Sequence, residues 1–127
     1  MRDVTFSPKG GLLAFIQIGQ LPKIVNVHLN TIDIIPVDAE VSAVQFTDND
    51  GELLLGTTDG QIILWNLTRK EVISKYRVSD EGAVRQLAYN SKNRVIVALL
   101  GNTPYIVSMD NELSRRPEAL SIPYSCI

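Results

Sequence analysis

The sequence predicts an all-β fold, a β-propeller of four-stranded antiparallel blades, and three observations support this prediction. Short apolar runs of strand length alternate with turns rich in Gly, Pro, Asn and Asp along the 127 residues. No segment has the period of a long amphipathic helix. The pattern also repeats, because Phe6, Phe46 and Tyr89 occupy matching places 40 and 43 residues apart. A period of this size, with four short strands per unit, is typical of propeller blades, which bury two apolar faces by stacking around an axis.

The first unit, residues 1–39, starts with alternating apolar and polar residues and turns at a Ser-Pro-Lys-Gly-Gly segment. A continuous apolar run follows, and Gly-Gln-Leu-Pro ends it. Pro36 lies in the last predicted strand, which indicates an outer position where a missing N–H is tolerated. The strands are expected at 4–6, 12–18, 24–29 and 31–37.

The second unit, residues 40–81, repeats this order most clearly. Its turns contain Asp48 to Gly51, Asp59-Gly60 and Thr68 to Lys70. Its last strand alternates apolar and polar residues, as a half-exposed outer strand does. The strands are expected at 41–46, 53–57, 62–67 and 72–78.

The third unit, residues 82–123, contains the most apolar run of the chain, 95–100. Turns are predicted on both sides of this run, at 90–93 and 101–104. The strands of this unit are expected at 83–89, 95–100, 105–109 and 119–122.

The segment Thr57-Thr58-Asp59-Gly60-Gln61-Ile62-Ile63-Leu64-Trp65-Asn66 resembles the WD-repeat β-propeller family. It matches the family's Ser/Thr-x-Asp-Gly-x-apolar-x-apolar-Trp-Asp ending, with Asn66 in place of the usual Asp. The resemblance implies that a Ser or Thr, an Asp and a Trp brace the blade through hydrogen bonds, while the family's His is missing here. It therefore implies structural roles for Thr57 (or Thr58), Asp59, Gly60 and Trp65.

The other two units lack this motif. Val25-Asn26 and Val107-Ser108 stand where Trp65-Asn66 stands in the second unit, so the repeats are degenerate or belong to a related propeller. Three units are fewer than a closed propeller needs. Three interpretations stay open: a fragment of a larger propeller, a ring completed by another chain or a second copy, and a compact β-sandwich or barrel.

Composition excludes several classes of protein. The hydrophobic fraction of 45% and charged fraction of 20% indicate a globular chain, and the net charge of −2 provides no overall positive field for nucleic acid or an anionic membrane. No apolar run approaches the roughly 18 residues of a membrane span. The N-terminus lacks the apolar core of a signal peptide, and its strand pattern suggests an internal position in a longer chain.

Candidates for catalysis and metal binding are few. The lone Cys126 forms no internal disulfide, which favours an intracellular protein, and the lone His28 has no metal-ligating companions. Asp48 and Asp50 echo a calcium loop, but an apolar strand follows where further oxygen ligands are needed. We expect no cofactor, no metal and no catalytic residue.

In a propeller the connections between strands lie on two opposite faces of the ring. The charged residues of this sequence are distributed unequally between these two faces. One face is expected to be basic and acidic together, with Lys9, Arg69, Lys70, Lys92, Arg94, Arg115 and Arg116 among its residues. The other face is expected to be acidic and to bind a partner with a basic surface. Its proposed contact residues are Asp38, Glu40, Asp59, Asp80 and Glu81.

These patterns support three functional hypotheses. The first is a non-catalytic scaffold for protein–protein contacts, and the resemblance implies a multi-protein assembly in the cytoplasm or nucleus. The second is a small-ligand-binding or enzymatic propeller that uses its central channel, where the inner strands offer Ser42, Gln45, Arg85 and Gln86. The third, nucleic-acid binding through the basic residues, predicts steeply salt-dependent binding and has few aromatic residues for stacking bases.

Overall fold

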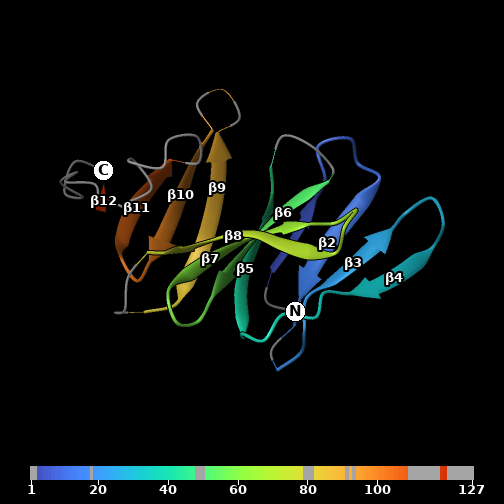
Figure 1. Cartoon of the computed structure of the whole chain (residues 1–127), viewed down its shortest axis with the longest axis horizontal. Coiled ribbons are helices and arrows are strands. Elements are labelled where there is room, and N and C mark those ends of the chain that lie inside the picture. The colour runs from blue at the N-terminus through green and yellow to red at the C-terminus, as the bar shows by residue number, and fades with distance from the viewer. Residues whose placement is uncertain are drawn as a thin grey trace.

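The computed structural model describes residues 3–17, 19–47, 51–78, 82–90, 92, 94–108 and 118–119. These residues form three four-stranded antiparallel sheets and contain no helix (Figure 1). In each sheet the strands pair in the order in which they occur along the chain. The prediction of an all-β chain with antiparallel sheets is therefore confirmed.

We name the sheets by their order in the sequence. The first sheet contains β1 (Asp3–Phe6), β2 (Leu12–Ile16), β3 (Lys23–Asn26) and β4 (Thr31–Ile34). The middle sheet contains β5 (Val41–Phe46), β6 (Glu52–Thr57), β7 (Gln61–Asn66) and β8 (Glu71–Arg77). The third sheet contains β9 (Val84–Asn90), β10 (Val95–Leu100), β11 (Thr103–Ser108) and β12 (Glu118–Ala119).

Several strands end earlier or begin earlier than the sequence pattern predicts. β3 ends at Asn26 rather than at residue 29, because the Asn26 side chain accepts backbone N–H bonds from His28 (3.1 Å) and Leu29 (3.0 Å) and starts a turn. β4 ends before Pro36. β11 begins at Thr103 and includes Pro104, where a turn was predicted. A proline is tolerated there because β12 pairs with β11 only farther along the strand.

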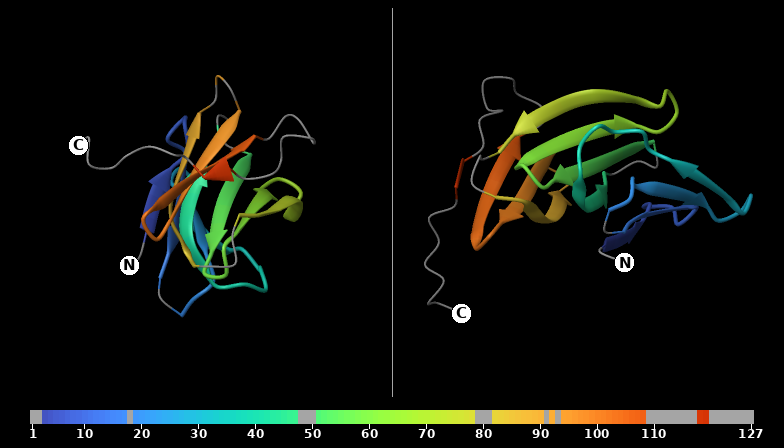
Figure 2. Two further views of the ribbon diagram at one scale, coloured as in Figure 1. Left: turned by 90° about the vertical axis from the view of Figure 1, so that its left-hand side faces the viewer. Right: turned by 90° about the horizontal axis from the view of Figure 1, so that it is seen from below.

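The middle sheet lies between the other two (Figure 2), and the first strands of the sheets lie next to one another. Side-chain hydrogen bonds connect these inner strands in the described part of the chain. The backbone N–H of Val44 on β5 donates to Asp3 Oδ2 on β1 at 3.1 Å. The hydroxyl of Ser42 on β5 donates to the carbonyl of Val84 on β9 at 2.5 Å. Each bond satisfies a backbone group on the free side of a sheet's edge strand.

The apolar core consists of two clusters, one on each face of the middle sheet. We call the contact of the first and middle sheets the first joint and that of the middle and third sheets the second joint. The continuous run Leu53, Leu54 and Leu55 is fully buried because its side chains alternate between the two joints. The first joint also contains Ala14, Ile16, Ile24, Ile35, Val37, Val41, Val44, Phe46, Ile63 and Trp65. The second joint also contains Ala43, Ile62, Leu64, Tyr76, Val78, Val84, Leu87, Ile96, Ala98, Leu100 and Val107.

Candidate functional site

The turn between β6 and β7 is held by side-chain hydrogen bonds. Buried Thr57 donates its hydroxyl to Asp59 Oδ1 and accepts the backbone N–H of Gln61 at 3.0 Å. The Gln61 side chain donates to Asp59 Oδ2 at 3.3 Å. Gly60 has φ +85°, which a side chain would strain. Thr57, Asp59 and Gly60 therefore lie together in one turn, with Gln61, which the sequence motif did not single out.

Trp65, the fourth residue of the motif, lies four positions beyond this turn, on β7. Its ring is buried in the first joint, where the middle sheet packs against the first sheet. Burial of this large aromatic surface stabilises the contact between the two sheets.

The described acidic residues of the predicted binding face gather at one edge of the middle sheet. Asp38 and Glu40 are exposed in the β4–β5 connection, and Asp59 is exposed in the β6–β7 turn. The two segments touch, because the backbone N–H of Thr58 donates to the carbonyl of Glu40 at 3.0 Å. We call Asp38, Glu40 and Asp59 the acidic edge. Asp80 and Glu81 lie outside the described residues.

One arginine also reaches the acidic edge. The guanidinium of Arg77 donates to the backbone carbonyl of Asp59 at 3.4 Å. A count of the charges on the connections alone missed Arg77, because it is the last residue of strand β8. Among the described residues, the acidic edge therefore has three carboxylates beside the Arg77 guanidinium.

The polar residues expected in a central channel do not converge. Ser42 is buried and bonded to the backbone of β9, and the Gln45 side chain donates to the carbonyl of Phe46 at 3.1 Å. Arg85 donates to the carbonyl of Gly101 at 2.9 Å and lines a shallow cavity of about 380 Å³ at the end of the third sheet. Neither Ser42, Gln45 nor Gln86 lines that cavity.

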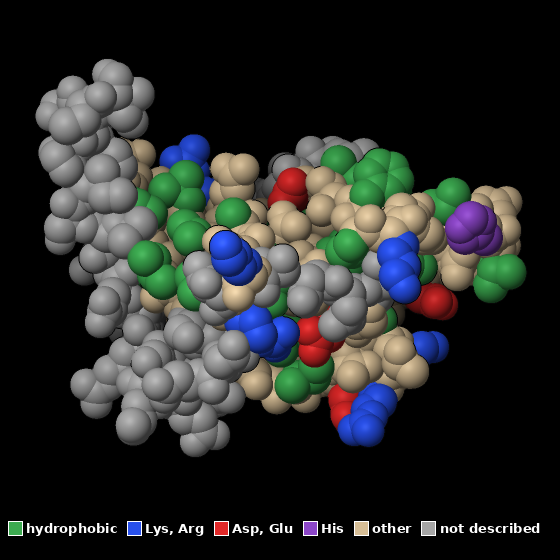
Figure 3. All heavy atoms as spheres, turned by 90° about the horizontal axis from the view of Figure 1, so that it is seen from above, with side chains coloured by type: hydrophobic (Ala, Val, Ile, Leu, Met, Phe, Trp, Pro, Cys, Tyr) green, Lys and Arg blue, Asp and Glu red, His purple; other side chains and the backbone are tan. Residues whose placement is uncertain are grey.

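In the described part of the chain, the residues considered for metal binding and for nucleic-acid binding do not form a site. Over the described residues no group of three or more His, Cys, Asp or Glu side chains could hold a metal ion. His28 is exposed in the β3–β4 turn, and Asp48, Asp50 and Cys126 lie outside the described ranges. Among the basic residues, Arg69 lies 3.8 Å from Glu71, while Arg115 and Arg116 are not described. Figure 3 shows cationic and anionic side chains interspersed on one face of the molecule.

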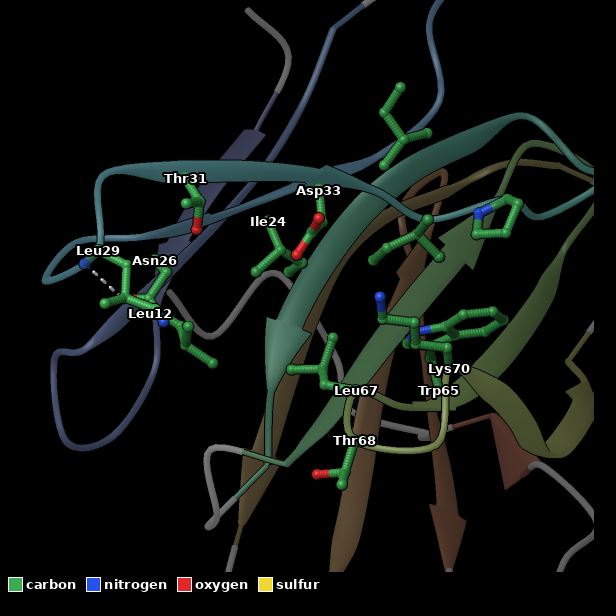
Figure 4. Close-up of a pocket in the computed structure, with 13 residues that line it drawn as sticks. Leu12, Ile24, Asn26, Leu29, Thr31, Asp33, Trp65, Leu67, Thr68 and Lys70 are labelled. Atoms are coloured by element: carbon green, nitrogen blue, oxygen red, sulfur yellow. Dashed lines mark hydrogen bonds between the residues drawn. The ribbon is translucent and has the colours of Figure 1, made fainter.

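A cavity of about 430 Å³ lies between the first and middle sheets, beside β4 of the first sheet and the β7–β8 turn of the middle sheet (Figure 4). Leu12, Ile24, Trp65 and Leu67 are among its apolar lining residues. Its polar lining residues come from both sheets and are Asn26, Thr31, Asp33, Thr68 and Lys70. A cavity of this volume and lining can accept a small apolar group and hydrogen-bond its polar end. It was not predicted, because it exists only where two separate sheets diverge.

The outward surface of the first sheet is apolar and uncovered. Strand pairing places Val4 opposite Phe15 and Phe6 opposite Leu13, so these side chains share one face. We call this surface the open face; it consists of Val4, Phe6, Leu13, Phe15, Val25, Ile32 and Ile34. Val4 is 46% exposed, Phe6 63%, Ile32 62% and Ile34 57%. Exposed apolar surfaces of this kind are typical of regions that contact another protein, a membrane or a ligand.

Comparison with known proteins gives the fold but no family. No family model matches the chain, and no curated protein sequence matches it. Solved structures do match it: 684 chains, among them hydrazine synthase from Kuenenia stuttgartiensis. With that structure the TM-score is 0.77 at 15% sequence identity, over 93% of this chain and 34% of that chain. This chain thus spans about a third of that one, and at such low identity the likeness concerns the fold alone.

The described residues were also searched for a helix that could span a membrane. Among them no helix has the length and apolarity needed to cross a bilayer.

Proposed function

We propose that this chain is part of a WD-repeat-like β-propeller and acts as a rigid, non-catalytic platform for protein–protein contacts. Each four-stranded sheet is one blade, so the chain supplies three blades of a larger or split ring. We further propose an intracellular, multi-protein assembly as its setting. The segment Thr57 to Asn66, the repeat of about 40 residues and the side-by-side packing of three antiparallel sheets support this proposal.

The acidic edge is the observation that supports the platform function best. Its carboxylates are exposed, yet the backbone beneath them is fixed by two bonds: Thr58 N–H to Glu40 O, and Val78 N–H to Gly60 O at 2.8 Å. A surface held in this way loses little conformational entropy when a partner binds. Carboxylates on such a surface steer a basic partner and set its orientation.

The test uses a lysine-rich peptide as the probe, with binding measured by fluorescence anisotropy at low and physiological salt. The double variant Asp38→Asn/Glu40→Gln is expected to weaken binding by about tenfold at low salt, since each exposed charge contributes up to about 1 kcal/mol. The matched control, Asp33→Asn/Glu71→Gln, removes the same charge from other exposed positions. If both double variants weaken binding equally, net charge rather than the acidic edge explains the binding, and the proposed site is wrong.

A further inference from the structure

The open face of the first sheet repeats a surface that is buried in the middle sheet. Val4 pairs with Phe15 and Phe6 with Leu13 in the first sheet. Forty residues later, Val44 pairs with Leu55 and Phe46 with Leu53, in the same register. Equal register places the corresponding side chains on equivalent faces of the two sheets.

The two equivalent surfaces differ in burial because only one of them has a cover. In the middle sheet, Val44 is 3% exposed, Phe46 1%, and both Leu53 and Leu55 0%, because the first sheet packs on them. Val4 and Phe6, the counterparts of Val44 and Phe46, are largely exposed. The open face is therefore equivalent to the surface of the middle sheet that packs in the first joint.

The side chains that cover the middle sheet identify the other half of the joint. They include the cross-strand pair Ala14 and Ile24, on the inward face of the first sheet. The equivalent pair in the middle sheet is Leu54 and Leu64, which packs against the third sheet. In the third sheet the equivalent pair is Val97 and Ile106.

The pair Val97 and Ile106 lies on the outward face of the third sheet. Pairing and alternation place Val95, Leu99 and Pro104 on the same face, and all five side chains are only half-buried. We call these five residues the third-sheet face. The outward surfaces of the first and third sheets are thus equivalent to the two surfaces that pack together in the joints of the middle sheet.

We infer that the occupant of the open face is the third-sheet face of a second copy of this chain, so that two copies close a ring of six sheets. The inference rests on the propeller arrangement proposed above. Closed propellers have about four to eight blades. The described residues of one copy form three sheets, so two copies together form six, a number within that range. Two identical head-to-tail joints would then cover both outer surfaces.

Lys23 lies among the apolar side chains of the open face, between Phe15 and Ile34, and its position fits a buried joint. It lies across from Phe15, with its amine 5.9 Å from the centre of that ring. The amine donates to Gln20 Oε1 at 2.6 Å, and Gln20 is exposed outside the strands. The charged end can therefore stay in water at the margin while the aliphatic part of Lys23 is covered.

Light scattering of the chain at several concentrations tests the inference. The wild-type chain is expected to have twice the 14.1 kDa mass of one copy. Phe6→Asp on the open face and Val97→Asp on the third-sheet face are each expected to raise the dissociation constant of the pair by at least about 30-fold, the effect of a central interface residue. Ile73→Asp is the control, because Ile73 is 44% exposed on β8 and lies on neither face. Trp65 emission verifies that each variant is folded.

A mixing experiment distinguishes the head-to-tail contact from other contacts. An equimolar mixture of Phe6→Asp and Val97→Asp chains retains one intact joint per mixed pair, so pairs are expected to reappear. If Phe6→Asp separates the copies and Val97→Asp does not, the open faces contact each other and the inference is wrong. A wild-type monomer, or a continuous series of masses, would also overturn it. A monomer that still binds the lysine-rich peptide through the acidic edge would leave the platform function intact.

Discussion

Gly56 on β6 is a point of very close approach between the middle and third sheets in the second joint. A Cβ atom at this position would lie 2.5 Å from Val84 Cγ1 and 2.7 Å from Val84 Cβ on β9. Both are below any normal contact distance, and Cβ of Val84 cannot move away without its backbone. The strand of the middle sheet therefore needs glycine here so that β9 can approach.

We predict that Gly56→Ala lowers the free energy of unfolding by about 1–3 kcal/mol, the usual cost of overpacking a core. Gly82→Ala is the matched control: nothing lies within 4 Å of its added Cβ, and its φ is not in the left-handed region. The Gly82→Ala variant is expected to change the free energy of unfolding by less than about 1 kcal/mol, and any change is expected to be an increase. Urea unfolding followed by the emission of Trp65 measures both, and equal effects of the two variants would contradict this account of Gly56.

The residue scale also shows what the sequence could and could not predict. Asp59 and Gly60 were expected in a tight turn from local chemistry, and they lie there, because an Asx side chain and a glycine act within a few residues. The need for glycine at residue 56 depends on Val84, which is distant in sequence. No local pattern carries that information.

Three turns of the molecule share one design. Each begins with an asparagine whose Oδ1 accepts a backbone N–H: Asn26 from Leu29 at 3.0 Å, Asn66 from Arg69 at 2.9 Å and Asn90 from Lys92 at 3.0 Å. Each has a residue with positive φ four positions later, and these are Asn30 (54°), Lys70 (55°) and Arg94 (50°). An aspartate offers the same acceptor atom, which explains how Asn66 stands where the resembling family has Asp.

The residues with positive φ in these turns allow the energetic cost of the turn conformation to be tested. Lys70 is exposed, and a lysine in this conformation costs about 1 kcal/mol that glycine avoids. We predict that Lys70→Gly raises the free energy of unfolding by up to about 1 kcal/mol, after the greater entropy of glycine in the unfolded chain is subtracted. Thr68→Gly, in the same turn but without positive φ, is expected to lower it. Urea midpoints of the two variants decide the matter, and a loss of stability in Lys70→Gly would contradict the prediction.

Strand positions could be predicted from the sequence better than strand ends. The apolar runs placed β1 to β11 approximately, because side-chain alternation and burial act on whole segments, while residues 120–122 of the last predicted strand lie outside the described residues. The ends depend on single interactions, such as the Asn26 side chain that stops β3. The start of β11 was missed because Pro104 and Gly101 indicate a turn, while pairing with Leu99 and Leu100 on β10 extends the strand.

At the scale of the whole molecule, the sequence could not show which apolar face is uncovered. Val4, Phe6 and Leu13 have the same chemistry as Val44, Phe46 and Leu53, and only the presence of a neighbouring sheet makes them differ. Whether a face is buried depends on which sheets pack together. A repeating sequence pattern therefore predicts that each sheet has an apolar face, but it does not predict which of these faces another sheet covers. The cavity beside Trp65 and Lys70 was missed for the same reason.

The arrangement of the three sheets predicts how protection from hydrogen exchange is distributed over the molecule. The middle sheet is covered on both faces, and the side chains of β6 and β7 are almost all buried. Every residue of β4 is exposed, and β8 is mostly exposed. Amides of β6 and β7 are therefore expected to exchange slowest and those of β4 fastest, because opening a doubly covered strand requires the loss of both joints.

The exchange rates of the first sheet are expected to depend on whether a second copy of the chain is bound. In the Phe6→Asp variant the amides of β2 are expected to exchange faster than those of β6, because one face of β2 has no cover. In the wild-type chain at high concentration they are expected to slow toward the rate of β6, since a second copy then covers that face. Amide exchange measured by mass spectrometry at two concentrations checks both statements. If the amides of β2 exchange as slowly as those of β6 in the variant as well, the uncovered face does not make β2 easier to open. Each sheet would then be stable by itself, and contacts between the sheets would not determine the exchange rates.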